Sequence, residues 1–113
     1  MDEQARRKLR LLVMIARSEA ALDELVTGML DVGITGATVL ESKGLGAIMR
    51  QDMPMFAGLA ALLPQHTGSR VVISLTNTDE ILNLRRYVDD MEPDQQPIAI
   101  TLPIDDAWGP IRL

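Results

Sequence analysis

The sequence feature that most constrains the fold is a nearly unbroken aliphatic run from Leu9 to Ala16 (LRLLVMIA) near the start of the chain. Its residues suit a β-strand, and a strand that is apolar on both sides has to be buried on both faces. A similar run, RVVISLT at 70–76, follows much later. A chain of 113 residues has room for one domain, so the two runs predict the central strands of a single sheet.

A segment with a helical pattern directly follows each of these strands. Ser18 suits the N-cap of the first helix, and Gly33 suits a left-handed stop at its end. Asn77 or Thr78 caps the second helix, with Glu80 in the capping-box position. The apolar stripes expected to be buried are Leu22, Leu25, Val26, Met29 and Leu30 in the first helix and Ile81, Leu84, Val88 and Met91 in the second.

Two shorter segments complete the set of strands, GATVLES at 36–42 and PIAITL at 97–102, the latter on an edge of the sheet because it begins with proline. The order is then β-α-β, a long loop, and β-α-β. Two right-handed crossovers that share one sheet give an α+β fold of ferredoxin-like βαββαβ type. This fold has an antiparallel four-stranded sheet with two helices on one face. We predict a single domain over 1–113, with a flexible tail at 1–8 and a C-terminal tail at 104–113.

The second face of the predicted sheet has no helix to cover it within one chain. The first and third predicted strands are apolar on both faces, so this second face would expose a broad aliphatic surface to water. We therefore expect the protein to associate with copies of itself.

The long loop at 43–69 needs a reason to exist in so small a domain. It opens with Gly44 and Gly46, which let the backbone approach a ligand and turn N–H groups toward an anion. The same two glycines also suit a flexible hinge. If an anion binds there, Arg50 is the nearest cation in sequence, and Lys43 is the second choice.

Within this loop, residues 53–63 (MPMFAGLAALL) are strongly apolar and are bounded by prolines. This pattern predicts a short helix with Phe56, Leu59 and Leu63 on one face. Such a face either packs on the protein's own sheet or on a sister subunit, or it docks a target protein.

The sequence offers no arrangement of residues for catalysis. It contains no supported Ser/His/Asp pattern, P-loop or dinucleotide fingerprint. His66 is the one histidine and has no further metal ligand near it in sequence, while Asp105 and Asp106 suit a solvated turn. The absence of cysteine excludes disulfides and thiolate metal sites. We predict a binding and assembly module rather than an enzyme.

Charge and hydropathy limit the partners further. A net charge of −5 argues against nucleic acid, and the basic cluster Arg6, Arg7, Lys8 and Arg10 suits a solvated end of the chain. No apolar run approaches the roughly 20 residues that span a bilayer, so we expect no membrane insertion. The first four residues lack the layout of a secretory signal, and we expect a cytoplasmic location.

Two stretches of the sequence resemble the PII nitrogen-regulatory proteins. LDEL at 22–25 and GITGATVLESKGLG at 33–46 are similar to the family pattern LDxV…GVxGMTVxExxGFGRQ, and LP at 63–64 resembles the point where the family's T-loop rejoins the third strand. The resemblance implies a signal-transduction protein that forms a homotrimer and binds an adenine nucleotide in clefts between subunits. It also implies a T-loop, here 43–69, that engages a transporter, enzyme or regulator. The positions that match the nucleotide cleft are Thr38, Gly44, Leu45 and Gly46.

The sequence also departs from the family pattern. The Arg-Gln pair after the last glycine is Ala47-Ile48 here, and the glycine-rich loop after the second helix is replaced by EPDQQ at 92–96. These changes remove a cation and a set of backbone donors for phosphate, so they favour a different or smaller ligand, or none. Two other interpretations share the fold: a trimeric structural protein of the CutA type without nucleotide binding, and an ACT-like domain that binds an amino acid.

Overall fold

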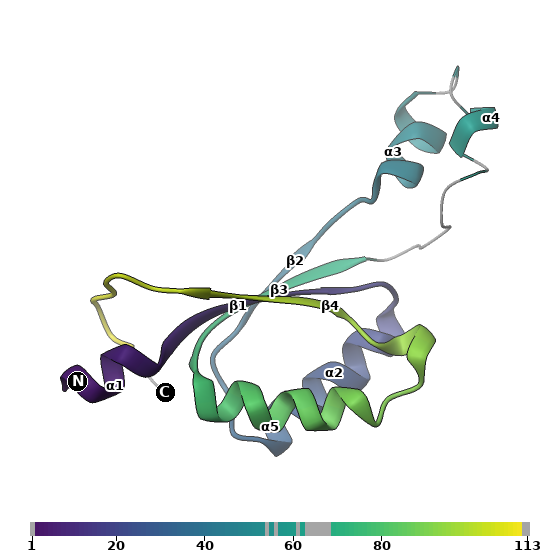
Figure 1. The fold of residues 1–113 in the computed structure, drawn as a ribbon. Coiled ribbons are helices and arrows are strands. Elements are labelled where there is room, and N and C mark those ends of the chain that lie inside the picture. The colour runs from purple at the N-terminus through teal and green to yellow at the C-terminus, as the bar shows by residue number, and fades with distance from the viewer. Residues whose placement is uncertain (1, 54, 56, 61, 63–68, 112–113) are drawn as a thin grey trace.

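The computed structural model describes residues 2–53, 55, 57–60, 62 and 69–111 (Figure 1). Four strands form one antiparallel sheet in the order β2-β3-β1-β4. The strands are β1 (Leu9–Ala16), β2 (Thr38–Glu41), β3 (Arg70–Asn77) and β4 (Ile98–Pro103). The helices α2 (Glu19–Asp31) and α5 (Thr78–Asp89) lie together on one face of this sheet. The predicted ferredoxin-like fold, with its two long apolar strands at the centre, is confirmed.

The predicted helix caps are present with the expected chemistry. The Ser18 hydroxyl accepts a hydrogen bond from the backbone N–H of Ala21 at 3.0 Å, and Gly33 adopts a φ of 91° just after α2. Asn77 accepts from the N–H of Glu80 at 2.9 Å. The Glu80 carboxylate accepts from the Thr76 hydroxyl at 2.7 Å, which satisfies a buried polar group of β3.

The core lies between the sheet and the two helices. Its buried members are Leu12, Met14, Ala16, Leu25, Met29, Ile34, Val72 and Leu84. One residue of the predicted stripe is placed differently, because Leu30 is exposed. The buried face of α2 is centred on Leu25 and Met29, and Leu30 lies about 100° further round the helix, so it faces away from the sheet.

The contact between α2 and α5 depends on one small residue. Gly28 is buried in α2, and a Cβ atom at this position would overlap the ring of Tyr87 on α5. The missing side chain therefore allows the aromatic ring to lie directly against the helix backbone. Tyr87 is one of three aromatic residues in the chain, and its packing here fixes how closely the helices approach.

Two short helices add to the predicted elements, and a third lies within the helix predicted at 53–63. The segment 1–8, expected as a flexible tail, contains α1 (Glu3–Lys8), which Asp2 caps by accepting from Ala5 N–H. The long loop contains α3 (Leu45–Asp52) and α4 (Ala57–Ala60), and the second is the described helical part of the helix predicted at 53–63. At the start of the predicted span, Met53 is the C-cap of α3. Figure 1 shows both loop helices projecting beyond the end of the sheet.

We predict that Gly28→Ala lowers the free energy of unfolding by about 1–3 kcal/mol, because the new methyl group forces the Tyr87 ring or the helices apart. Urea denaturation measures the change. Gly58→Ala in α4 is the matched control, since a Cβ there meets no atom within 4 Å, and its stability should equal or slightly exceed that of the wild type. A Gly28→Ala protein as stable as the wild type would contradict this packing.

Candidate functional site

The candidate site follows β2, an edge strand that leads from the body of the domain into the long loop. Thr38 begins this strand and lies opposite Ile73 in the ladder with β3. The predicted strand 36–42 is shorter in the structure, because the Gly36 carbonyl accepts a hydrogen bond from the Ser74 side chain and lies outside the ladder. In the described part of the chain, no strand pairs with the outer edge of β2.

Thr38 borders a hollow of about 430 Å³ at the N-terminal end of β2. Its walls come from three strands and from the C-terminal tail, and they comprise Leu11, Gly36, Ala37, Thr38, Ile73, Leu75, Pro110 and Ile111. Thr38 carries the single hydroxyl in this otherwise aliphatic hollow. The hollow therefore suits a flat apolar ligand group, and the Thr38 hydroxyl is the polar side-chain group that can contact it.

The other predicted site residues lie at the opposite end of β2, around the start of α3. Gly44 is the N-cap of α3 with a φ of −71°, and its carbonyl accepts from Ile48 N–H at 3.1 Å. Lys43 forms an ion pair with Asp52 at 3.6 Å, and Arg50 lies in the last turn of the same helix. The backbone N–H groups of the first helical turn, which begins at Leu45, have no partner within an α-helix and are oriented toward its N-terminus.

The predicted backbone of the two loop glycines needs correction. They were expected to leave the backbone free to approach a ligand, but they lie at the start of a helix, and positive φ among the described residues occurs at Gly33 and Gly109. Gly46 is instead part of α3. The reason is that the following residues, AIMRQD, are mostly strong helix formers, so the helix begins at once after Gly44.

The structure does not gather all six predicted ligand residues into one pocket. Thr38 and Gly44 are six residues apart along nearly extended chain, which corresponds to about 20 Å. Thr38 belongs to the hollow on the sheet, whereas Lys43, Gly44, Leu45, Gly46 and Arg50 belong to the loop. A ligand that touches both groups has to be elongated and lie along β2.

The base of the long loop is held by Arg70, a residue that the sequence analysis did not single out. Its side chain is 19% exposed and pairs with Glu19 of α2 at 3.5 Å and with Glu41 of β2 at 3.6 Å. Beside it, Ser42 N–H donates to the Ser69 carbonyl at 3.1 Å and closes the base of the loop. Arg70 thus ties both strands that carry the loop to the helix layer.

The segment at 92–96 after α5 stands where the PII pattern has a glycine-rich loop, and it contains hydrogen bonds of its own. Pro93–Gln95 forms a 3-10 turn in which Gln95 N–H donates to the Glu92 carbonyl at 2.8 Å. Arg17 at the end of β1 donates to the Gln96 carbonyl at 3.1 Å. This arrangement holds the segment against the body of the domain.

The long loop carries a group of exposed apolar side chains, which we call the loop-tip patch. Its described members are Leu45, Met53, Met55, Leu59 and Leu62. Met55 and Leu62 are 84% and 82% exposed. The predicted assembly residues Phe56 and Leu63 lie outside the described residues. Within the described part of the loop, α3 and α4 mainly contact each other rather than the sheet.

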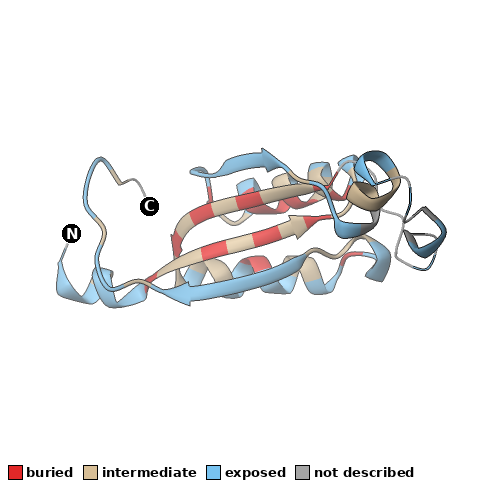
Figure 2. Ribbon diagram, turned by 90° about the horizontal axis from the view of Figure 1, so that it is seen from above, coloured by how far each residue is buried: buried red, intermediate tan, exposed pale blue. Residues whose placement is uncertain are grey.

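The sheet face opposite the helices is aliphatic, and we call it the open sheet face. Among the described residues no helix covers it, and the C-terminal tail reaches it at one end (Figure 2). Figure 2 looks onto it and shows β1 and β3 alternating between buried and intermediate residues, with β2 and β4 exposed on either side. The strand register places the following residues on this face: Leu11, Val13, Ile15, Thr38, Leu40, Val71, Ile73, Leu75, Ile98, Ile100 and Leu102. All but one of these side chains are aliphatic.

Among the described residues, no three His, Asp or Glu side chains are grouped so that they could hold a metal ion. No helix in the described part of the chain has the length and apolar character required to cross a bilayer.

Comparison with solved structures identifies the class of fold. CPII, a nitrogen regulatory PII-like protein from Thiomonas intermedia K12 solved with ADP, AMP and bicarbonate, aligns with a TM-score of 0.60 at 14% identity, over 91% of this chain and 96% of that chain. A putative PII-like signalling protein from Thermus thermophilus aligns with a TM-score of 0.53 at 16% identity, over 83% and 82% of the two chains. No protein-family model and no curated protein sequence matches the chain. The chain therefore has the fold of the PII-like proteins, at an identity that fits a divergent sequence.

We predict that Arg70→Gln speeds amide hydrogen exchange at Ser42 about fivefold, equivalent to about 1 kcal/mol, because the ion pairs to Glu19 and Glu41 are lost. Arg86→Gln on the exposed side of α5 is the matched control and should leave this rate unchanged. Equal rates in wild type and Arg70→Gln would show that Arg70 does not hold the base of the loop.

Proposed function

We propose that this protein is a divergent PII-like regulator that forms a homotrimer, senses a small ligand in clefts between subunits, and controls a partner protein through residues 43–69. The observation that carries the proposal is the position of the Thr38 hollow, which joins the open sheet face at the β2 edge. A subunit that covers this face also closes the hollow, so assembly and ligand binding involve the same surface.

The open sheet face supports the assembly. An aliphatic surface that spans four strands is costly to expose to water, and association removes it from solvent. Three copies with their open faces turned toward a common axis bury all of these faces together. The helices then lie outside, and each β2 edge meets the neighbouring subunit.

An adenine nucleotide is the ligand that best fits the geometry along β2. The base fits the apolar hollow beside Thr38, and the phosphates then extend toward the N–H groups at the start of α3. Of the two solved relatives above, CPII binds ADP and AMP.

Affinity for this ligand should be modest. Lys43 is paired with Asp52, and the backbone N–H groups of Gln95 and Gln96 donate to carbonyls of their own segment. The nucleotide thus lacks contacts that the resemblance would otherwise imply, and we expect micromolar binding or weaker, about −8 kcal/mol. The same two observations favour the alternative function, a trimeric structural protein of the CutA type that binds no nucleotide.

The loop-tip patch is the proposed contact for the partner protein. Methionine and leucine side chains adapt to varied apolar surfaces, and here they stand exposed on a segment that projects from the domain. The proposed ligand contacts lie at the start of α3, and Leu45 of this helix belongs to the loop-tip patch. Ligand binding and partner contact therefore involve the same helix.

We predict a mass in solution of about three times the 12.4 kDa chain, measured by light scattering. Val13→Glu places a charge in the middle of the open sheet face and should give monomers. Leu82→Glu is the control, because Leu82 is 51% exposed on α5 and lies on the other side of the molecule. A wild-type monomer, or a trimer that tolerates Val13→Glu, would contradict the proposed assembly.

We further predict that Gly46→Val abolishes binding of ADP and AMP in titration calorimetry. The branched side chain would shield the N–H groups of the first turn of α3 from the phosphates. Gly58→Val, in the other loop helix, is the control and should bind as the wild type does. Unchanged binding in Gly46→Val removes this site, and no binding heat in the wild type favours the structural alternative.

A further inference from the structure

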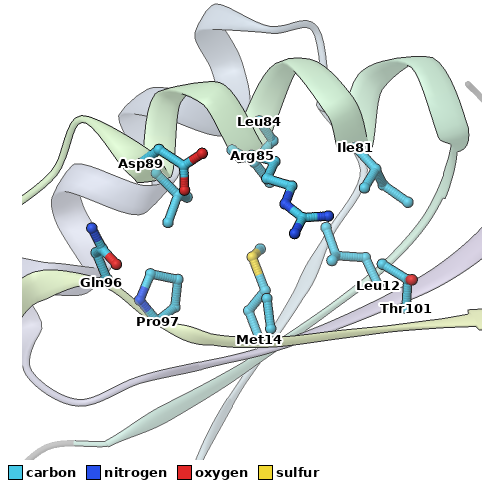
Figure 3. Close-up of a pocket in the computed structure, with 11 residues that line it drawn as sticks. Leu12, Met14, Ile81, Leu84, Arg85, Asp89, Gln96, Pro97 and Thr101 are labelled. Atoms are coloured by element: carbon cyan, nitrogen blue, oxygen red, sulfur yellow. The ribbon is translucent and has the colours of Figure 1, made fainter. Parts of the chain in front are cut away.

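A second pocket lies on the helix side of the sheet, between α5 and the edge strand β4. Its volume is about 380 Å³, within the range of about 300–1,000 Å³ typical of small-molecule sites. Leu12 and Met14 of β1 form its floor, and Leu84 and Val88 of α5 form one wall (Figure 3). The pocket is at the opposite edge of the sheet from β2, so it is separate from the site proposed above.

Two opposite charges from successive turns of α5 line this pocket. Figure 3 shows Arg85 extending its guanidinium toward the strands, on the side of Leu12 and Thr101. Asp89, one turn further along α5, lies toward Gln96 and Pro97. No ion pair joins Arg85 and Asp89 to each other or to any other described residue. Both charges are thus available to a ligand.

Two uncharged polar groups complement these charges. Gln96 donates its side-chain N–H to the Met91 carbonyl at 3.1 Å, which orients its amide oxygen as an acceptor on the pocket side (Figure 3). Thr101 lies opposite Leu12 in the ladder and brings a hydroxyl that can donate at the Arg85 side. The pocket therefore has a donor end around Arg85 and an acceptor end around Asp89, above an aliphatic floor.

We propose that this pocket binds a free amino acid with an aliphatic side chain. The carboxylate binds Arg85 and Thr101, the ammonium group binds Asp89 and the Gln96 oxygen, and the side chain packs on the floor. A simple carboxylate would be repelled by Asp89 and a simple amine by Arg85. A neutral apolar molecule would remove both charges from water without pairing them.

Titration calorimetry of the full chain with leucine and two analogues tests the proposal. 4-Methylpentanoate is leucine without its ammonium group, and 3-methylbutylamine is leucine without its carboxylate. We expect leucine to bind and each analogue to bind at least about tenfold more weakly, because each loses one charged contact. No leucine binding at millimolar concentration, or equal binding of an analogue, overturns the proposal.

Substitutions on α5 locate the site. Arg85→Met keeps an apolar side chain of similar length, and Asp89→Asn keeps the shape of the carboxylate. Each should weaken leucine binding at least about tenfold, whereas Arg86→Met and Asp90→Asn, whose side chains do not line the pocket, should leave it unchanged. Equal effects of the test and control variants would overturn the assignment. Gly46→Val should bind leucine normally, which separates this site from the nucleotide site.

Discussion

Burial of the aliphatic sheet face is the constraint on which the rest of the structure depends. The helices α2 and α5 cover one face of the sheet and form the core with it. The described residues provide no third layer for the other face. Side chains such as Ile98, Ile100 and Leu102 on β4 remain about half exposed in the protomer. Each gains on the order of 1 kcal/mol when it is removed from water, so association stabilises the face as a whole.

The same constraint explains the positions of the proposed ligand site and the proposed partner surface. An assembly that covers the open sheet face also brings a neighbouring subunit to the β2 edge, next to Thr38. The long loop leaves the sheet at this edge and is fixed there by Arg70. Its helices therefore project outward from a firm base, and their apolar side chains stay available.

Much of the fold could be predicted from the sequence because its signals are local and agree with one another. The aliphatic run Leu9–Ala16 matches β1 residue for residue, and Ser18 and Asn77 cap the helices as expected. The open sheet face could be predicted because the first and third predicted strands are apolar on both faces, whereas the two predicted helices cover one face. Leu30 was misplaced because helical spacing alone does not set the exact rotation of a helix on the sheet.

The features that sequence reasoning missed depend on local competition or on distant partners. Glycines at 44 and 46 indicated a loop, yet the strong helix formers that follow extend α3 back to Leu45. The sequence did not indicate the ion pairs of Arg70, because its partners Glu19 and Glu41 are far from it along the chain. Arg85 and Asp89 are four residues apart, a spacing that is common on solvated helix surfaces. They line a pocket because β4 lies beside α5, and the sequence does not specify that arrangement.

Burial of the open sheet face can be measured most directly with a single introduced thiol, because the natural chain contains no cysteine. Ile100→Cys reports on the open sheet face and Leu82→Cys on the helix side, at positions that are 52% and 51% exposed in the protomer. If the open face is covered by other subunits, a maleimide reagent should label the cysteine at 82 rapidly and the cysteine at 100 much more slowly until the protein is denatured. Equal labelling rates at the two positions in the native protein would contradict the account.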